Sequence, residues 1–219
     1  NASIKGEEKV GGLVGLAYTS TITGCFTKGS VVSSDMCIGG IVGSSFGTSI
    51  SNCYSMASVK STGSSSNAWF QGGLVGAGYA GGGVSTTIVN SYSTGLIYDG
   101  NATGNVGGMV GRDYDLTAVG SFWDTDTSGQ ANSAGGAGKT TSEMQAASLY
   151  TAAGWSTGIW NLADGSYPTL KPPAAPNNAP TGLALSNAGV AENETVGTVV
   201  GTFSTTDDDT GDSHTYTLV

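Results

Sequence analysis

The chain has 219 residues, of which 37 are glycine, and it carries a net charge of −9 with only 11% charged residues. Globular domains usually contain about 25% charged residues, so this composition indicates tight turns and closely stacked backbone rather than a helical bundle. The negative charge argues against nucleic acid or an anionic membrane surface as a partner. No apolar run approaches the ~18 residues of a membrane span, so none is predicted.

A six-residue glycine box returns four times along the chain. The copies occupy residues 10–15, 38–43, 71–76 and 106–111, and read Val-Gly-Gly-Leu-Val-Gly with small changes. A second short apolar box follows each of them, at residues 22–26, 50–54, 88–92 and 118–122. Self-similarity at a spacing of about 30 residues is typical of a solenoid. Each repeat is therefore interpreted as one rung, with an inserted loop at residues 78–84.

Similar side chains recur at the same position of each repeat, as stacked parallel strands require. One column is large and apolar: Leu13, Ile41, Leu74 and Met109. A second column is aromatic: Phe26, Tyr54, Tyr92 and Phe122. The short boxes bounded by glycine suit strands rather than helices. The sequence thus predicts an all-β fold, with a parallel β-solenoid of four rungs over residues 1–122.

Two of the three cysteines, Cys25 and Cys53, share one repeat position. Stacking would place them about 4.8 Å apart, the spacing between neighbouring strands. We interpret them as a buried ladder of small apolar side chains, and a bond between them remains an alternative. Cys37 has no counterpart in the other repeats, and nothing in the sequence suggests a catalytic role for it.

The two boxes together resemble the GLUG repeat of large bacterial surface proteins. The resemblance is carried by Gly-Gly-Leu-Val-Gly followed by Ile-x-Asn-Cys-Tyr-Ser, best seen at residues 52–55 and 90–95, and it covers about residues 10–170. It implies an extracellular, adhesin-type or filamentous protein at the bacterial cell surface, with a β-solenoid fold and no catalytic residues. Because the chain starts at Asn1 without a leader, we expect it to be a piece of a longer protein.

Residues 123–170 break the period and are predicted to cap the solenoid. Residues 140–143 (Thr-Thr-Ser-Glu) form a capping box, helix formers follow, and Gly154 is a plausible stop. The tryptophans Trp123, Trp155 and Trp160 would cover the last apolar face, as the terminal unit of a solenoid must. The same aromatic side chains could instead form a sugar-binding platform.

Residues 171–180 contain four prolines and are predicted to be an extended linker. After it, residues 181–219 resemble the start of a cadherin-like repeat, through Val-Ala-Glu-Asn at 190–193 and the acidic run at 206–212. The resemblance implies a calcium site in which Glu192, Asp207 and Asp209 are ligands, with Asp212 as a looser candidate. Clustered carboxylates are also what Ca²⁺ requires on chemical grounds, and a solvated acidic turn is the alternative.

The cadherin-like segment is only about forty residues long, too short for a β-sandwich with a core of its own. We therefore expect a partial sandwich that is either disordered or paired with something else, which could be the solenoid's own edge or another chain. Strand addition by residues 181–219 to a neighbouring subunit would build a head-to-tail filament.

No catalytic set is evident, so the chain is predicted not to be an enzyme. Its one histidine, His214, lies in the tail, and the best carboxylate pair outside the tail is Asp124 with Asp126. Paired acids on a β-helix would be the enzymatic alternative. The sequence favours a structural and adhesive role, as a stalk or filament subunit that contacts other protein chains or an extracellular polysaccharide. A carbohydrate-binding module is the second candidate.

Overall fold

The computed structural model describes residues 2–63, 70–98, 105–173, 177–209 and 212–217. The chain divides into two compact units, Asn1–Lys171 and Pro172–Val219. The two units are described separately below.

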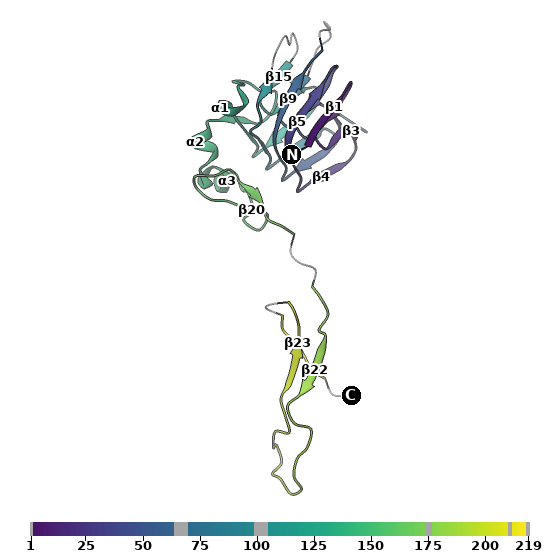
Figure 1. Cartoon of the computed structure of the whole chain (residues 1–219), viewed down its shortest axis with the longest axis vertical. Coiled ribbons are helices and arrows are strands. Elements are labelled where there is room, and N and C mark those ends of the chain that lie inside the picture. The colour runs from purple at the N-terminus through teal and green to yellow at the C-terminus, as the bar shows by residue number, and fades with distance from the viewer. Residues whose placement is uncertain (1, 64–69, 99–104, 174–176, 210–211, 218–219) are drawn as a thin grey trace. The chain divides into compact units, whose positions relative to one another are not determined.

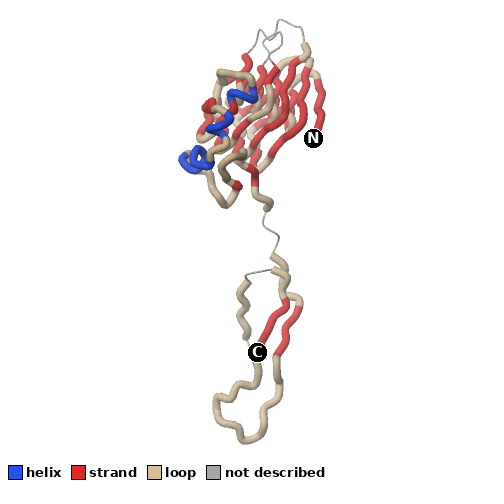
Figure 2. Tube along the Cα trace, turned by 60° about the vertical axis from the view of Figure 1, so that its left-hand side comes forward, coloured by secondary structure: helices blue, strands red, loops and turns tan. Residues whose placement is uncertain are grey.

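The first unit is a stack of short strands that form four sheets, with strands from every repeat in each sheet (Figure 1). All strand pairs in these four sheets are parallel, and Val42 lies opposite Val14 on one side and Val75 on the other. The same register joins the equivalent positions of all four repeats, and Figure 2 shows the strands lying side by side. The predicted parallel β-solenoid is therefore confirmed.

The strands of the four sheets follow the repeats closely. The first sheet contains β1 (Ala2–Gly6), β5 (Phe26–Ser33), β9 (Tyr54–Ser61), β13 (Tyr92–Ser93), β14 (Ile97–Tyr98), β18 (Phe122–Asp124) and β19 (Ala137–Lys139). The second contains β2 (Val10–Gly11), β6 (Cys37–Gly39), β10 (Phe70–Gly72) and β15 (Asn105–Gly107). The third contains β3 (Val14–Tyr18), β7 (Val42–Phe46), β11 (Val75–Tyr79) and β16 (Val110–Asp113). The fourth contains β4 (Thr21–Thr23), β8 (Ser49–Ser51), β12 (Thr86–Val89) and β17 (Leu116–Val119).

The predicted apolar column forms the centre of the solenoid. Ile41, Leu74 and Met109 are completely buried, and Val42, Val75 and Val110 lie beside them in the same core cluster. Leu13 occupies the same column in the first rung, yet 49% of its surface is exposed because no complete rung covers it. The solenoid thus has an open end at its first rung.

The glycine boxes are required by backbone contacts between rungs. A Cβ on Gly40 would lie 2.1 Å from the carbonyl oxygen of Gly73 in the next rung, so only glycine fits there.

A different constraint acts within the second box, where the backbone is left-handed in every repeat. The residue there is Gly24 (φ 61°), Asn52 (φ 50°), Asn90 (φ 47°) or Gly120 (φ 54°). Glycine and asparagine tolerate this conformation best, which explains why only these two types occur at the position.

Residues 125–170 form the cap, with three short helices and a two-stranded sheet: α1 (Thr125–Ser128), α2 (Thr141–Met144), α3 (Ala147–Ala152), β20 (Trp160–Asn161) and β21 (Thr169–Leu170). The predicted capping box is present, because Thr140 and Glu143 bond each other's backbone amides. These bonds from Thr140 also lower the pKa of Glu143. The predicted single helix is divided in two, since the turn at Asp164 and Gly165 bonds the chain at Ala147 and Gln145.

The cap covers more of the solenoid than its last face. At the end of the stack, Ser133 accepts hydrogen bonds from the amides of Met109 and Val110, as a further rung would. The aromatic residues of the cap then pack along the first sheet back to the second rung, where Trp160 donates to the side chain of Asn52 (3.2 Å). Tyr54, Tyr92 and Phe122 of the aromatic column are buried by this cover.

The second unit contains one antiparallel hairpin of β22 (Gly182–Leu185) and β23 (Phe203–Thr206). β-branched residues recur at 181–185 and 195–203. The first segment contains β22, whereas the second contributes only Phe203, the first residue of β23. Val196 and Val199 are exposed and outside any strand, since the hairpin has no second layer to bury them. The described residues of this unit therefore form a two-stranded sheet, not a sandwich.

Candidate functional sites

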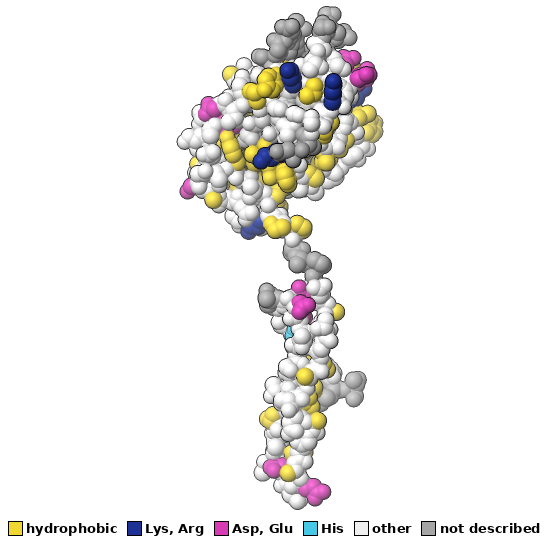
Figure 3. Space-filling model, viewed as in Figure 1, with side chains coloured by type: hydrophobic (Ala, Val, Ile, Leu, Met, Phe, Trp, Pro, Cys, Tyr) yellow, Lys and Arg dark blue, Asp and Glu magenta, His cyan; other side chains and the backbone are white. Residues whose placement is uncertain are grey.

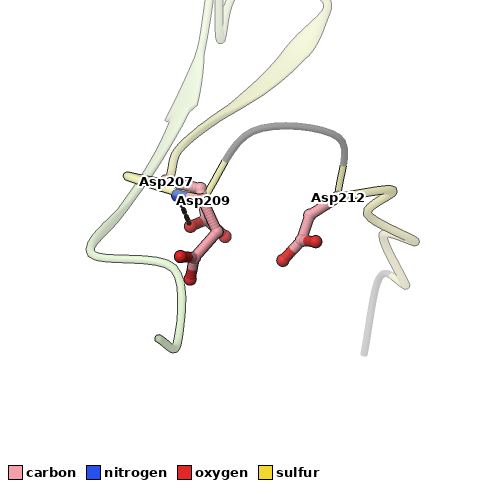
Figure 4. Close-up of side chains that lie close together, drawn as sticks. All are labelled: Asp207, Asp209 and Asp212. Carbon is pink, nitrogen blue, oxygen red and sulfur yellow. Dashed lines mark hydrogen bonds between the residues drawn. The ribbon is translucent and has the colours of Figure 1, made fainter. Parts of the chain in front are cut away.

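Three of the four predicted calcium ligands lie together after β23. One carboxylate oxygen from each of Asp207, Asp209 and Asp212 lies within 4.8 Å of the others (Figure 4). The backbone orients two of them: the amide of Asp209 donates to Asp207 Oδ1 (3.0 Å), and Asp209 Oδ2 accepts from the amide of Asn178 (2.5 Å). The fourth predicted ligand, Glu192, is described by the structure but is not a member of this group.

The side chain of Asp207 is largely buried, and only 6% of it is exposed. Among the described residues, none donates a hydrogen bond to its Oδ2 atom. His214 Nε2 lies 3.7 Å from that oxygen, which is beyond hydrogen-bond length. Buried carboxylate oxygens normally have a partner, and hard oxygen ligands suit Ca²⁺. The residues present therefore fit a calcium ion, which would supply the missing partner and offset the repulsion among three carboxylates.

Asp124, the candidate catalytic acid, is fully buried and makes four hydrogen bonds. Its Oδ1 accepts from the amides of Asp126 and Thr127 as the N-cap of α1, and its Oδ2 accepts from the hydroxyls of Thr141 (2.8 Å) and Tyr167 (2.5 Å). Asp126 in turn accepts from the amide of Thr141. Both carboxylates hold α1, α2 and β18 together, so the geometry explains them as parts of the cap.

The tryptophans of the cap do not form an exposed platform. Trp123, Trp155 and Trp160 have exposed fractions of 6%, 3% and 0%. Their indole N–H groups donate to Gln130, Gly120 and Asn52, respectively. A sugar ring needs an exposed aromatic face, and the rings of Trp155 and Trp160 are covered by other aromatic rings. The expectation of a platform built from these three residues is therefore wrong, and Trp69 lies outside the described residues.

The structure reveals a second aromatic column on the surface, formed by Tyr18, Phe46, Tyr79 and Tyr114. Phe46 and Tyr79 stack with ring centroids 4.5 Å apart, and Arg112 covers the ring of Tyr114. Desolvation by burial raises the pKa of Tyr79 to about 12. The sequence did contain a signal for this column, because each aromatic residue follows the first glycine of its repeat by seven residues.

The open end of the solenoid combines exposed apolar side chains with free strand edges. Both aromatic columns end there, at Tyr18 (59% exposed) and Phe26 (56% exposed), and the apolar column ends there at Leu13. A hollow of about 240 Å³ lies at this end and is lined in part by Ile4, Leu13, Phe26 and Lys28. Strand β1 pairs only with the second half of β5, from Gly29 to Ser33. Among the described residues, β2, β3 and β4 have a partner strand on one side only.

The second unit is acidic and apolar on its surface. It contains six acidic residues and no lysine or arginine. Leu183 is 66% exposed on β22, and Figure 3 shows apolar and acidic side chains on the surface of this unit. A two-stranded hairpin is marginal on its own, and its apolar side chains need a partner to bury them.

Comparison with known proteins identifies the class of repeat. Residues 6–32 and 34–60 match the family model of the GLUG motif. These matches correspond to the first two rungs, and the strand register extends the same architecture to the third and fourth. The chain is therefore a β-solenoid that contains GLUG motifs.

One curated relative shares part of this sequence. Over 102 residues the chain is 34% identical to a "Putative Gly-rich membrane protein" of Evansella cellulosilytica, a match that covers 44% of this chain and 11% of that protein. The match thus spans about a tenth of the relative's length. No solved structure matches the chain. Within the described residues, no helix is long and apolar enough to cross a membrane.

Proposed function

We propose that the chain is a structural and adhesive module of a large extracellular bacterial surface protein, where it acts as a stalk or filament component and not as an enzyme. The observation that carries this proposal is the stack of four in-register rungs, closed at one end by a cap and open at the other. The GLUG motifs support it, as does the description of the relative as a membrane protein. The carboxylate of Asp124 accepts four hydrogen bonds within the cap, which supports a non-catalytic role.

We also propose that copies of the chain associate head to tail, by strand addition of the C-terminal hairpin to the open end of another copy. The hairpin offers exposed Leu183, and the open end offers Leu13, Phe26 and unpaired strand edges. Charge favours the contact, because the second unit is acidic and Lys28 lines the hollow at the open end. The pairing of β1 with β5 is a precedent for an added parallel strand at this edge.

Sedimentation velocity of the full chain over a range of concentrations tests the association. Wild type should form a series of oligomers. Leu183→Lys on the hairpin and Leu13→Lys at the open end should each leave a monomer, because each buries a charge in the proposed contact. Val119→Lys is the matched control, since Val119 is 57% exposed on β17 in the fourth rung and lies outside the contact.

Mixing the two variants makes the test directional. The Leu13→Lys chain keeps an intact hairpin, and the Leu183→Lys chain keeps an intact open end. An equal mixture should form dimers that do not grow further. A wild-type chain that stays monomeric at all concentrations, or a mixture that stays monomeric, would overturn head-to-tail assembly. Thermal melts of each variant verify that it is folded.

We propose that Asp207, Asp209 and Asp212 bind one Ca²⁺ ion that orders the chain after β23. Titration calorimetry of the full chain should give a Kd of about 10⁻⁴ to 10⁻³ M, as for extracellular calcium modules. Asp207→Asn should weaken binding at least about tenfold, because it removes a charged ligand. Glu192→Gln distinguishes the two ligand sets: it has no effect if the three aspartates suffice. Asp115→Asn, an exposed acid of the solenoid, is the control. No binding heat at millimolar Ca²⁺ would refute the site.

A further inference from the structure

The row of small residues before the aromatic column places two thiols on neighbouring rungs. Phe26 pairs with Tyr54 in register, and the amide of Tyr54 donates to the carbonyl of Cys25 (3.0 Å). Cys25 and Cys53 therefore lie opposite each other, about 4.8 Å apart at the spacing of neighbouring strands. This spacing lies inside the range of about 4.4–6.8 Å between the Cα atoms of disulfide-bonded cysteines.

The two side chains also have the same orientation. Each thiol donates to the carbonyl two residues earlier, Cys25 to Thr23 (3.2 Å) and Cys53 to Ser51 (3.2 Å). The row continues as Ser91 and Ser121, whose hydroxyls make the same local bond. Cys25 packs against the core cluster that contains Cys53. Both thiols are unbonded in this structure.

The two cysteines differ in access to solvent. Cys53 is completely buried in the second rung, whereas Cys25 is half-buried, because the first rung is the open end. Burial raises the pKa of Cys53 to about 11. Since the thiolate is the reactive form, Cys25 should react first with a reagent from solvent and Cys53 second.

We propose that Cys25 and Cys53 are an oxidation site at which a disulfide joins the first rung to the second. The oxidant we name is a low-molecular-weight disulfide such as oxidised glutathione. The Cys25 thiolate attacks one sulfur of it, forming a mixed disulfide and releasing one glutathione thiolate. Cys53 then loses its proton and attacks the Cys25 sulfur, which releases the second glutathione. The protein dithiol is oxidised by two electrons, and one oxidised glutathione becomes two reduced molecules.

Closing the bond requires a local movement that the open end permits. The sulfurs must approach to about 2.05 Å, which a rotation about the Cα–Cβ bond of Cys25 can begin. No complete rung lies over Cys25 to oppose that rotation, whereas Cys53 is enclosed by its neighbours. The bond would tie the first rung, which has a neighbouring rung on one side only, to the buried second rung. The inference does not depend on the proposed assembly or on where the protein resides.

Intact mass spectrometry of the full chain in a glutathione redox buffer tests the site. Oxidation should remove two hydrogens and raise the melting temperature, and reduction should reverse both changes. Trypsin cuts after Lys28 and chymotrypsin after Phe46, so three separate peptides carry Cys25, Cys37 and Cys53. We expect a link between the first and third. Cys37 should stay reduced, because it is buried against Phe70 and Ala77 and burial raises its pKa.

Two variants test the order of events. Cys53→Ser should stop at a glutathione adduct on Cys25, whereas Cys25→Ser should give no adduct and no shift in melting temperature on oxidation. In wild type, the second step should accelerate about tenfold per pH unit while the pH stays below the pKa of Cys53. The proposal is overturned if wild-type chain remains a mixed disulfide, if its mass does not change, or if Cys37 supplies the second sulfur.

Discussion

The two ends of the solenoid contain the same repeat residues in opposite environments. Leu13 and Met109 occupy the same column, yet Leu13 is 49% exposed in the first rung and Met109 is fully buried in the fourth. The difference lies in the neighbours, because a non-repeat segment covers the fourth rung. Residues 132–134 bond the backbone of residues 108–110 there in place of a further rung. At the first rung, β1 pairs with the edge of the first sheet only.

This contrast teaches that the repeat specifies how rungs stack, while the irregular segments decide where stacking stops. The apolar side chain that a rung contributes to the column can pack against another rung on either side. The cap removes that possibility at one end, and the open end keeps it. Substitutions at matched positions should therefore have large effects near the cap and small effects at the open end.

The largest expected effect comes from removing the aromatic centre of the cap. Trp160→Ala should lower the free energy of unfolding by about 3–5 kcal/mol, since the side chain is fully buried and lies 4.5 Å, centroid to centroid, from Trp155. Phe26→Ala at the open end should cost only about 1 kcal/mol, because the ring is more than half exposed. Urea unfolding followed by circular dichroism measures both. Equal losses would contradict the distinction between the ends.

An intermediate effect is expected from one substitution made twice in the same column. Leu74→Ala should cost about 3 kcal/mol, because it leaves a cavity between two enclosing rungs. Leu13→Ala should cost less than about 1.5 kcal/mol, since water already reaches this side chain. Comparable unfolding free energies for the two variants would show that the first rung is covered in solution, for example by a second copy. Repeating the measurement at low protein concentration would test this explanation, because a second copy would then dissociate.

A smaller effect, confined to alkaline solution, should arise at the capped end. Burial raises the pKa of Tyr92 and of Tyr150 well above the ordinary value of about 10. Their contribution is complete below pH 10 and is lost as pH rises above it, because the unfolded chain then ionises while the folded chain does not. Stability should fall by up to about 1.4 kcal/mol per pH unit for each tyrosine.

Tryptophan fluorescence against pH follows this loss, since the described tryptophans lie in the cap and its contact with β18. Above pH 10, Tyr92→Phe should reduce the slope of the unfolding free energy against pH by the contribution of one tyrosine. The substitution also removes the hydrogen bond to the carbonyl of Pro168. A variant with the wild-type slope would show that other groups cause the alkaline transition.

The repeats made the solenoid predictable, because a column such as Leu13, Ile41, Leu74 and Met109 is visible in sequence once the glycine boxes are aligned. The cap was predictable only in part. Its capping box at Thr140 is a local signal, whereas the contact of Trp160 with Asn52 joins residues 108 positions apart and follows no period. The calcium candidates illustrate the same limit: Asp207 and Asp209 are near in sequence, but the proximity of Asn178 and His214 arises from the path of the chain.

The one-sided cover also determines how the solenoid responds to mechanical force. The chain enters the stack through β1 at the open end, and the strands of each rung pair only with those of adjacent rungs or the cap. Tension on the N-terminus would therefore release rungs one at a time, and the hydrogen bond of Trp160 to Asn52 would add resistance at the second rung. The first two glycine boxes begin at residues 10 and 38. Each released rung would therefore lengthen the chain by roughly 95 Å, at about 3.4 Å per residue. A disulfide between Cys25 and Cys53 would keep the chain between these two residues, about one rung in length, from extending. Oxidation would therefore shorten the total extension under force by about one step.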